Sequence, residues 1–398
     1  MPFLPITLVF AALHAWIGWR VIPPLDLLAG WPVSGWLTGS LLVASALLTP
    51  TAFKLTRRPS PTVAVVIAVW LGLLCMGLFS SLFVLTLLRD FFLVVAWLLF
   101  CVLDLLGVTR PSLDTVQALS AAAVPLLALL ATVWGFWRAR RTAGVVRVDV
   151  PISGLPPALH GFTVAQISDI HIGPTIRRPY LQRIVERVNA LGADMVAVTG
   201  DLVDGSVAEL ASHVAPLAGL LSRHGTFFVT GNHEYYSGAQ SWITELRRLG
   251  VQVLVNQHVV LHHTAASDDK ALAGASLVVA GVADFSAHRF IESHRSDPAA
   301  ALAGAPDHVS TRLLLAHQPR SAALAAEAGF QLQLSGHTHG GQIWPWNHFV
   351  RFQQPFTAGL DRLQGLWVYT NRGTGYWGPP KRFGVASEIT FLRLVAAP

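Results

Sequence analysis

The sequence predicts a helical transmembrane region followed by an α/β domain. Three observations predict this arrangement. The first third is almost continuously apolar, and the remainder alternates short apolar runs with amphipathic segments. In addition, the chain is 53% hydrophobic but only 13% charged, well below the roughly 25% charged residues of a soluble domain. The character changes at Arg141, so we place the domains at residues 1–141 and 142–398.

The distribution of charge follows the same division. Residues 1–144 hold nine Lys or Arg against four Asp or Glu, a net charge of +5, whereas the rest holds nineteen against eighteen. The excess positive charge of the chain therefore belongs mainly to the apolar region. A basic patch of the kind that binds nucleic acid is not indicated, and we expect no nucleic-acid partner.

Four apolar stretches reach the length of about 20 residues that a bilayer crossing needs. They are Phe3–Ile22, Trp36–Phe53, Thr62–Leu88 and Leu119–Trp137. A fifth stretch, Phe91–Gly107, is shorter and carries Asp104. The transmembrane region is therefore predicted to contain four to five helices.

Positively charged residues favour one topology. Lys54, Arg57 and Arg58 form one cluster, and Arg138, Arg140 and Arg141 form another. Four spans, with Phe91–Gly107 interfacial or re-entrant, place both clusters on the cytoplasmic face, as the positive-inside rule favours. Five spans place them on opposite faces. We favour four spans and a cytoplasmic α/β domain.

Beyond Arg141, helices and strands alternate. The apolar spacing predicts helices over Arg178–Leu191, over Ser206–Arg223 with a bend at Pro216, and over Ser241–Leu249. Later runs, Val251–Val255, Val259–His262 and Ser276–Val282, are typical of meandering strands, and Ser321–Ala328 is predicted to be a helix. Alternation of strand and helix favours parallel strands joined by crossover helices.

Five apolar runs end in a metal-binding type of residue. Phe162–Ser168 precedes Asp169 and His171; Met195–Thr199 precedes Asp201; Thr226–Thr230 precedes Asn232; Arg312–Ala316 precedes His317; and the run through Leu334 and Ser335 precedes His337 and His339. If these strands share a sheet, their ends meet, and ligands of open α/β sheets lie at such ends.

The donors on these residues suit a pair of divalent cations. Mixed nitrogen and oxygen donors without thiolate favour Mn, Fe, Zn or Co, and Mn is the metal that we favour. Seven donors exceed the needs of one tetrahedral ion, whereas two ions about 3.5–4 Å apart would share them. Asp201 has two carboxylate oxygens and can bridge such a pair. A pair of this kind acidifies a water and stabilises displacement at phosphorus.

These residues also carry a family resemblance. Asp169-x-His171, Gly200-Asp201, Gly231-Asn232-His233-Glu234, His317 and Gly336-His337-x-His339 resemble, in order, the five signature blocks of the calcineurin-like metallophosphoesterases. The resemblance covers about residues 145–398. The contexts Gln166–His171, Gly340–Gln342 and Asn371–Gly375 are similar to the membrane-associated bacterial branch, which implies a bacterial inner-membrane location.

The resemblance implies a role for each position. Asp169, His171, His339 and one oxygen of Asp201 would hold the first ion; the other oxygen of Asp201, with Asn232, His317 and His337, would hold the second. A hydroxide between the ions would attack phosphorus. His233 would act in catalysis without binding metal, by stabilising the transition state or protonating the leaving oxygen. The implied fold is a sandwich of two mixed β-sheets flanked by helices.

Neighbouring residues leave alternatives open. Glu234 is interpreted as a salt-bridge or capping residue, and Asp204 as a residue that closes its turn. Residues 342–352, rich in Trp and Phe, are either an interfacial patch that admits a lipid-linked phosphoester or a buried loop that closes the sandwich. Arg372, Lys381 and Arg382 are candidates for contact with substrate phosphate.

Two functional classes follow. The first is a membrane-anchored hydrolase acting on a lipid-linked phosphate or pyrophosphate, or on a soluble phosphodiester. The second is a membrane transporter or scaffold whose phosphoesterase-like domain is regulatory. The complete donor set favours the enzyme, because a regulatory copy would be expected to lose ligands.

Overall fold

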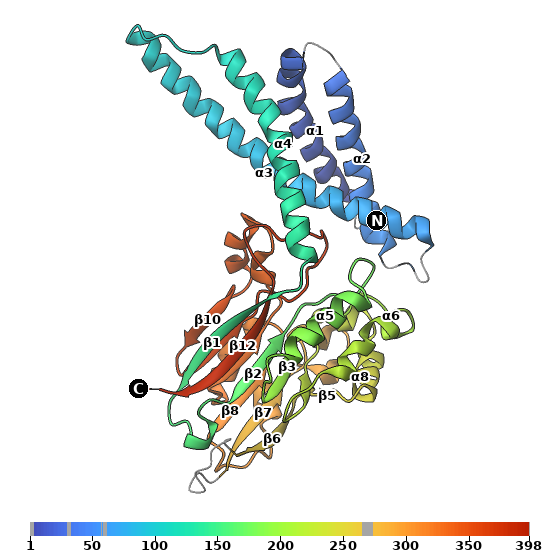
Figure 1. Ribbon diagram of the computed structural model, residues 1–398, viewed down its shortest axis with the longest axis vertical. Coiled ribbons are helices and arrows are strands. Elements are labelled where there is room, and N and C mark those ends of the chain that lie inside the picture. The colour runs from blue at the N-terminus through green and yellow to red at the C-terminus, as the bar shows by residue number, and fades with distance from the viewer. Residues whose placement is uncertain (1–3, 30–32, 57, 59–61, 265–273, 398) are drawn as a thin grey trace. The chain divides into compact units, whose positions relative to one another are not determined.

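The computed structural model describes residues 4–29, 33–56, 58, 62–264 and 274–397. The chain divides into two compact units, one helical and one α/β (Figure 1). The helical unit comprises residues 1–138 together with Gly378–Phe383, and the α/β unit comprises the rest. Phe3, the first residue of a predicted span, and Arg57, of the first positive cluster, lie outside the described residues.

The described part of the helical unit contains four helices that are long and apolar enough to cross a membrane. They are α1 (Leu4–Ala29), α2 (Val33–Leu55), α3 (Val63–Leu105) and α4 (Leu113–Arg140). Apolar side chains are exposed along all four, as is expected where lipid rather than water surrounds a helix. The four long predicted spans are therefore present as helices.

The predicted break after Leu88 is wrong, because α3 continues through Phe91–Leu105 as one helix of 43 residues. Arg89 and Asp90 do not end it, since both find partners within the bundle. Asp90 accepts hydrogen bonds of 2.8–3.0 Å from Arg20 of α1, and Arg89 donates to Ser120 Oγ of α4 at 3.0 Å. At 1.5 Å per residue, α3 is about 64 Å long, longer than one bilayer crossing requires.

Gly378–Phe383 packs within the helical unit although it lies late in the chain. Lys381 Nζ donates hydrogen bonds to Gly77 O at 2.7 Å, Ser81 Oγ at 2.6 Å and Thr132 Oγ1 at 3.1 Å. Lys381 and Arg382 are both buried. The interpretation of Lys381 as a contact for substrate phosphate is therefore wrong, and that of Arg382 stays a prediction.

The described residues of the α/β unit form two six-stranded mixed sheets. The first has the order β1-β12-β2-β3-β4-β5 and the second β10-β11-β9-β8-β7-β6. In the first sheet only the β12–β2 pair is antiparallel. In the second, the β10–β11 and β6–β7 pairs are antiparallel and the others parallel. The strands are β1 (Gly144–Ile152), β2 (Thr163–Ile167), β3 (Met195–Val198), β4 (Thr226–Phe228), β5 (Gln252–Val253), β6 (Gln257–His263), β7 (Ala275–Gly281), β8 (Thr311–Leu315), β9 (Leu332–Ser335), β10 (Gly359–Leu363), β11 (Leu366–Thr370) and β12 (Glu388–Ala396).

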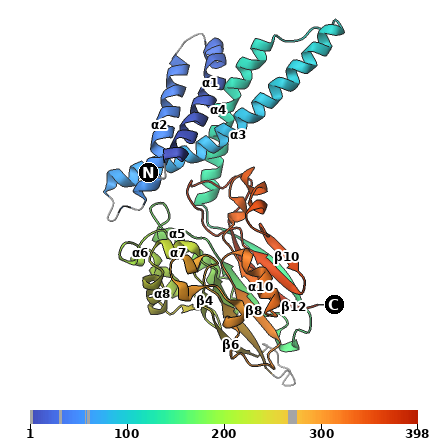
Figure 2. The same ribbon diagram turned by 180° about the vertical axis from the view of Figure 1, so that it is seen from behind.

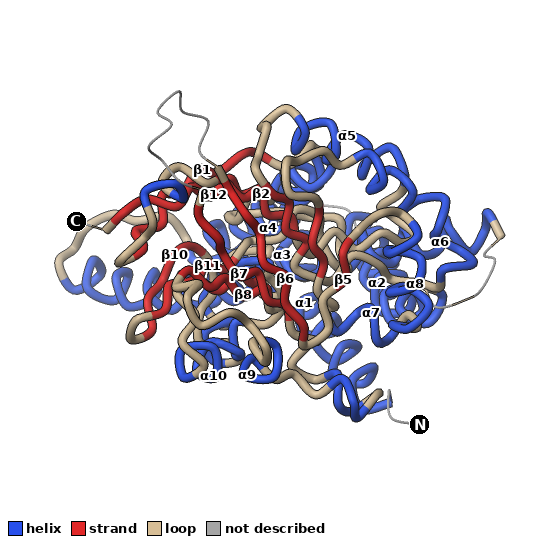
Figure 3. Tube along the Cα trace, turned by 90° about the horizontal axis from the view of Figure 1, so that it is seen from below, coloured by secondary structure: helices blue, strands red, loops and turns tan. Residues whose placement is uncertain are grey.

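The sheets pack face to face and helices cover their outer faces. Phe227 of β4, Leu313 of β8 and Leu334 of β9 belong to one buried apolar cluster between the sheets. A second cluster joins the first sheet to α5 (Arg178–Asn189), α6 (Val207–Val214) and α8 (Ala239–Arg248), and a third joins the second sheet to α9 (Pro298–Ala301) and α10 (Ala322–Glu327). Figure 3 shows the sheets between α5 on one side and α9 and α10 on the other; Figure 2 shows the unit from behind. The predicted sandwich is confirmed.

The helix predicted over Ser206–Arg223 is shorter than expected. The α-helix α6 ends at Val214, and Pro216 lies in a 3-10 turn, Ala215–Gly219. Proline lacks the amide hydrogen that an α-helix would use and clashes with the preceding turn. At the other end, Ser206 and Glu209 form a capping box, which fixes where the helix starts.

Candidate metal centre

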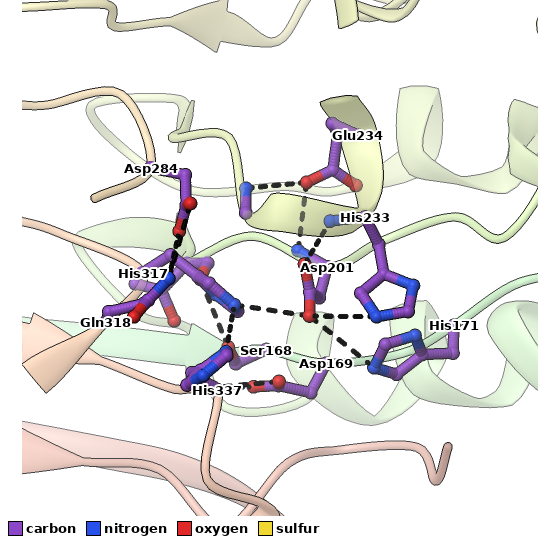
Figure 4. Close-up of polar contacts among 12 residues, drawn as sticks. Ser168, Asp169, His171, Asp201, His233, Glu234, Asp284, His317, Gln318 and His337 are labelled. Carbon is purple, nitrogen blue, oxygen red and sulfur yellow. Dashed lines mark hydrogen bonds and ion pairs between the residues drawn. The ribbon is translucent and has the colours of Figure 1, made fainter. Parts of the chain in front are cut away.

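The predicted donors meet at the ends of strands from both sheets. Asp169 follows β2, Asp201 follows β3 and Asn232 begins α7 (Asn232–Tyr236) just after β4, all in the first sheet. His317 follows β8, and His337 and His339 follow β9, in the second. The condition that these strands share one sheet is therefore wrong, although their ends still converge. Figure 4 shows side chains from both sheets turned toward Asp201.

The backbone is strained where it presents these side chains. Five of the seven donor residues have φ between 51° and 70°, a region that residues with a Cβ rarely adopt: Asp169, His171, Asp201, His337 and His339. Such conformations cost on the order of 1–3 kcal/mol each and gather at functional sites. The surrounding fold enforces a geometry that the local sequence disfavours.

Two glycines allow the donor loops to approach closely. A Cβ on Gly231 would lie 2.2 Å from Asp201 Oδ1, and one on Gly336 would lie 2.0 Å from Ser168 Oγ and 2.2 Å from Asp169 Oδ2. Neither position has enough space for a methyl group. Both positions therefore require glycine for steric reasons.

One group of donors consists of Asp169, His171 and His339, whose ligand atoms lie within 4.8 Å of one another. His171 Nε2 lies 3.1 Å from His339 Nε2. His339 Nε2 lies 3.5 Å from Asp169 Oδ1. Asp169 is further fixed by the backbone N–H of His337, which donates to its carboxylate at 3.0 Å.

A second group consists of Asp201, His317 and His337. His317 Nε2 lies 3.2 Å from both Asp201 Oδ2 and His337 Nδ1. Asp201 Oδ2 is also 3.8 Å from His171 Nε2 of the first group. The Asp201 carboxylate therefore lies between the two groups.

Three observations fit this arrangement to a pair of cations. Asn232 Oδ1 is buried and meets no hydrogen-bond donor among the described residues, which is costly unless a cation satisfies it. The ring nitrogens of His171 and His339 are 3.1 Å apart, and those of His317 and His337 are 3.2 Å apart. Because a metal–nitrogen bond is about 2.0–2.1 Å long, one cation can contact both nitrogens of such a pair. Finally, His317 Nδ1 donates to the carbonyl of Thr199 at 2.8 Å, which leaves Nε2 as the ligand atom.

The electrostatics suit cation binding at Asp201. Burial disfavours its charged form, but His317 and His233 outweigh burial and hold the pKa of Asp201 well below its usual range. Burial and the neighbouring His317 lower the pKa of His337 to about 4, so this imidazole is neutral. Metal ligands must be deprotonated, and Asp201 and His337 meet this condition. Burial lowers the pKa of His317, but Asp201 outweighs burial and raises this pKa well above its usual range, so a cation has to displace a proton from this ring.

His233 lies beside the donors and is held by Asp204. His233 Nδ1 is 2.5 Å from Asp204 Oδ1, and the same oxygen is 3.2 Å from His171 Nδ1. Burial lowers the pKa of His233, but the carboxylates of Asp201 and Asp204 outweigh it and raise this pKa to about 9. Asp204 was expected only to close its turn; instead it links a candidate catalytic residue to a candidate ligand. Its spacing three residues after Asp201 is the signal in the sequence.

Glu234 holds the backbone of the donor loops in place and is not one of the candidate metal-binding residues. Its carboxylate accepts hydrogen bonds from the backbone N–H groups of Gly231 at 2.6 Å, Asp201 at 3.0 Å and Leu202 at 2.8 Å. Burial, with the nearby Asp201, raises the pKa of Glu234 to about 8. The interpretation of Glu234 as a capping residue is confirmed.

Trp377 was not predicted, and Gln342 was indicated only by the family resemblance, without a role. The Trp377 ring lies 5.6 Å from that of His233 and 6.5 Å from that of His171. Gln342 exchanges two hydrogen bonds of 2.9 Å with the Trp377 backbone. Arg372, a candidate for substrate contact, donates to Glu388 Oε2 at 2.8 Å. Nothing in the local pattern distinguishes Trp377 from other surface aromatics.

Comparison with known proteins gives consistent matches. The family model described as calcineurin-like phosphoesterase matches residues 162–341. The protein named "Transmembrane protein with metallophosphoesterase domain" from Bos taurus is 42% identical over 72% of this chain and 65% of its own length. The protein of the same name from Danio rerio is 37% identical over 82% of this chain and 74% of its own length.

Bacterial and structural matches extend the comparison. An uncharacterized metallophosphoesterase of Helicobacter pylori is 35% identical, over 68% of this chain and 69% of its own. Among solved structures, the calcineurin-like phosphoesterase YfkN from Bacillus subtilis has a TM-score of 0.40 and 13% identity, over 54% of this chain and 82% of that one. The chain spans slightly less than two thirds of the bovine relative.

Proposed function

Because the chain belongs to the calcineurin-like phosphoesterases, we propose that it is a membrane-anchored hydrolase that cleaves phosphoesters with two divalent cations. The observation that carries this proposal is the position of Asp201. Its carboxylate lies between two groups of donors, 3.2 Å from His317 Nε2 and 3.8 Å from His171 Nε2. A single carboxylate shared in this way suits two neighbouring ions.

The proposed ligands divide into two sets. Asp169, His171 and His339 would hold the first cation and Asn232, His317 and His337 the second, with Asp201 shared between them. When bound, two such cations acidify a water for attack on phosphorus and neutralise charge on the phosphoryl oxygens. The donors suit Mn, Fe, Zn or Co, and we favour Mn.

The protein's own residues would manage the leaving group. His233 Nδ1 faces Asp204, so its Nε2, which lies 4.0 Å from Asp201 Oδ2, is the atom available to substrate. Protonated His233 can donate to a phosphoryl oxygen or to the leaving oxygen. Asp204 keeps the ring in this orientation and stabilises its positive charge. Asp204 is thus a positioning residue in the proposal.

The membrane region supports a lipid bilayer as partner. Four described helices have the length and apolarity of spans, and two relatives are named transmembrane proteins. We propose a bacterial inner-membrane location on the family resemblance described above, and a cytoplasmic α/β unit on the distribution of positive charge. The proposed substrate is a lipid-linked phosphate or pyrophosphate ester.

A turnover assay tests this proposal. The full chain, purified in detergent and loaded with Mn²⁺, should hydrolyse the chromogenic phosphodiester bis(p-nitrophenyl) phosphate. Asp201→Asn, which removes the shared carboxylate but keeps the size of the side chain, should lose at least about 100-fold in kcat. Equal turnover by both proteins would contradict the proposed hydrolase activity and favour the alternative, a regulatory phosphoesterase-like domain.

A further inference from the structure

The segment that follows the last proposed ligand carries exposed aromatic side chains. Trp344, Trp346, Phe349 and Phe352 are 40%, 38%, 55% and 75% exposed. We call these four residues the aromatic row. The interpretation of this segment as a buried loop is therefore wrong. Large apolar side chains gathered at one exposed place are typical of a contact surface.

Local geometry aligns three members of the row. Trp346–His348 and Val350–Phe352 are 3-10 turns, and residues three apart on a 3-10 turn lie on the same side. Trp346, Phe349 and Phe352 are spaced by three residues. Their ring centroids follow one another at 6.0 and 6.3 Å. The spacing of the aromatics thus matches the period of the turns that carry them.

The backbone after the aromatic row is held by hydrogen bonds to neighbouring loops. Arg320 Nε donates to the carbonyl of Gln353 at 2.9 Å, and Thr338 Oγ1 donates to the carbonyl of Thr357 at 2.6 Å. The side chain of Gln354 donates to Gln318 Oε1 at 3.2 Å. The backbone that directly follows the exposed rings is therefore held in place.

The charge of this segment suits an anionic surface. Residues 342–358 contain no Asp or Glu, and they contain Arg351 and His348. The Arg351 guanidinium lies 5.7 Å from the centroid of the Phe352 ring, and His348 and Arg351 are exposed. Aromatic rings next to basic side chains are the composition of protein surfaces that lie at lipid headgroups.

The same segment reaches the proposed metal centre. Gln342, at its start, holds the backbone of Trp377, whose ring lies against His233. The segment begins three residues after His339. A phosphoester at the metal centre and an apolar chain at the row could therefore belong to one molecule.

We propose that the aromatic row inserts into the headgroup region of the bilayer that holds the chain's own helices, and that the site thereby takes phosphoesters of membrane lipids. The bilayer is the favoured occupant because only three residues separate α4 from β1, so the α/β unit stays tethered to a predicted span. The substrate class rests on the proposed function. The insertion of the row does not.

A location measurement tests the insertion. In a Cys75→Ser, Cys101→Ser background, Phe352→Cys would carry a polarity-sensitive fluorophore, with one chain per nanodisc of phosphatidylcholine and phosphatidylglycerol. The matched control is Leu221→Cys, since Leu221 is 68% exposed elsewhere on the α/β unit. Lipids brominated near the headgroup should quench the label at 352 at least about threefold more than at 221. Equal quenching overturns the insertion, and so does burial of the label against protein or against a second copy.

A substrate comparison tests the consequence. The triple variant Trp346→Ser, Phe349→Ser, Phe352→Ser should lose about tenfold or more in kcat/KM on a diacyl phosphoester presented in vesicles. Its kcat/KM on soluble bis(p-nitrophenyl) phosphate should stay within about twofold of wild type, because the replaced rings are exposed. Equal loss on both substrates, or no loss on either, overturns the inference. A wild type inactive on both substrates would instead contradict the proposed function, while the quenching result would stand by itself.

Discussion

Asp204 Oδ1 lies 2.5 Å from His233 Nδ1, and this contact fixes which nitrogen of His233 faces the metal centre. The same oxygen is 3.2 Å from Nδ1 of His171, a proposed ligand. One carboxylate thus orients two imidazoles with different proposed roles. Burial opposes its ionisation, but His171 and His233 hold the pKa of Asp204 well below its usual range.

Asp204→Asn should lower kcat by about 10- to 100-fold and change KM little. The amide keeps the shape of the side chain but removes the charge that stabilises protonated His233. Asp204 also contacts His171, so the variant could instead lose metal. Metal content measured on the same samples separates a change at His233 from a loss of metal at His171. Asp149→Asn, at an exposed ion pair with Arg393, is the control. Unchanged kcat in Asp204→Asn would contradict the role given to this residue.

Removal of metal should destabilise the α/β unit. Five donor residues hold φ values of 51–70°, and bound cations would offset that strain. A cation at 100 times its Kd contributes about 2.7 kcal/mol, which corresponds to roughly 5–10 °C in Tm for a unit of this size. Thermal unfolding with EDTA and then with excess Mn²⁺ measures the shift. Asp201→Asn should show a much smaller one; equal shifts would point to binding elsewhere.

Gly231→Ala and Gly336→Ala should each reduce metal content and activity. The added methyl groups would lie 2.2 Å from Asp201 Oδ1 and 2.0 Å from Ser168 Oγ. Such overpacking costs about 1–3 kcal/mol, and here it displaces proposed ligands or their support. Gly365→Ala, where nothing lies within 4 Å of the new Cβ, is the matched control. Full activity in both site variants would show that these loops tolerate displacement.

Acid should destabilise the fold through His224 and His263, outside the metal centre. Their rings are joined at 3.1 Å and both pack on Phe162, with Asp194 and Arg223 close by. Burial lowers the pKa of both groups, so the unfolded chain, with a His pKa of about 6.5, binds protons more readily. The stability present above pH 6.5 is therefore lost as the pH falls below it.

The measurement is Tm between pH 7.5 and 5. The double variant His224→Gln, His263→Gln should show a shallower fall than wild type. His308→Gln, at an exposed position, should leave the slope unchanged. A slope in the double variant as steep as in wild type would assign the acid sensitivity to other groups.

The donors could be predicted because each lies directly after an apolar run. A strand end and a hard donor are both local features, so Asp169, Asp201 and His317 stand out without knowledge of the fold. Which sheet a strand joins is not local. Nothing near β8 or β9 indicates that they pair with β7 and β11 rather than with β2, so the strand ends alone could not tell one shared sheet from the two sheets that the family resemblance implied.

Other features depend on partners distant in sequence. Phe91–Gly107 was set apart from Thr62–Leu88, but the intervening Arg89 and Asp90 are accommodated inside the bundle by Ser120 and Arg20. No spacing in the sequence indicates that Trp377 lies against His233, whereas Asp204 can at least be noticed three residues after Asp201. Lys381 was a candidate for contact with substrate phosphate, but its three hydrogen bonds are to residues of the helical unit.

The most direct test of the central claim is the number of cations bound per chain. After loading with Mn²⁺ and dialysis, elemental analysis of the purified full-length protein should give two ions per wild-type chain and fewer than one per Asp201→Asn chain, because the shared carboxylate serves both. Two ions retained by Asp201→Asn, or no more than one bound by wild type, would contradict a dinuclear centre.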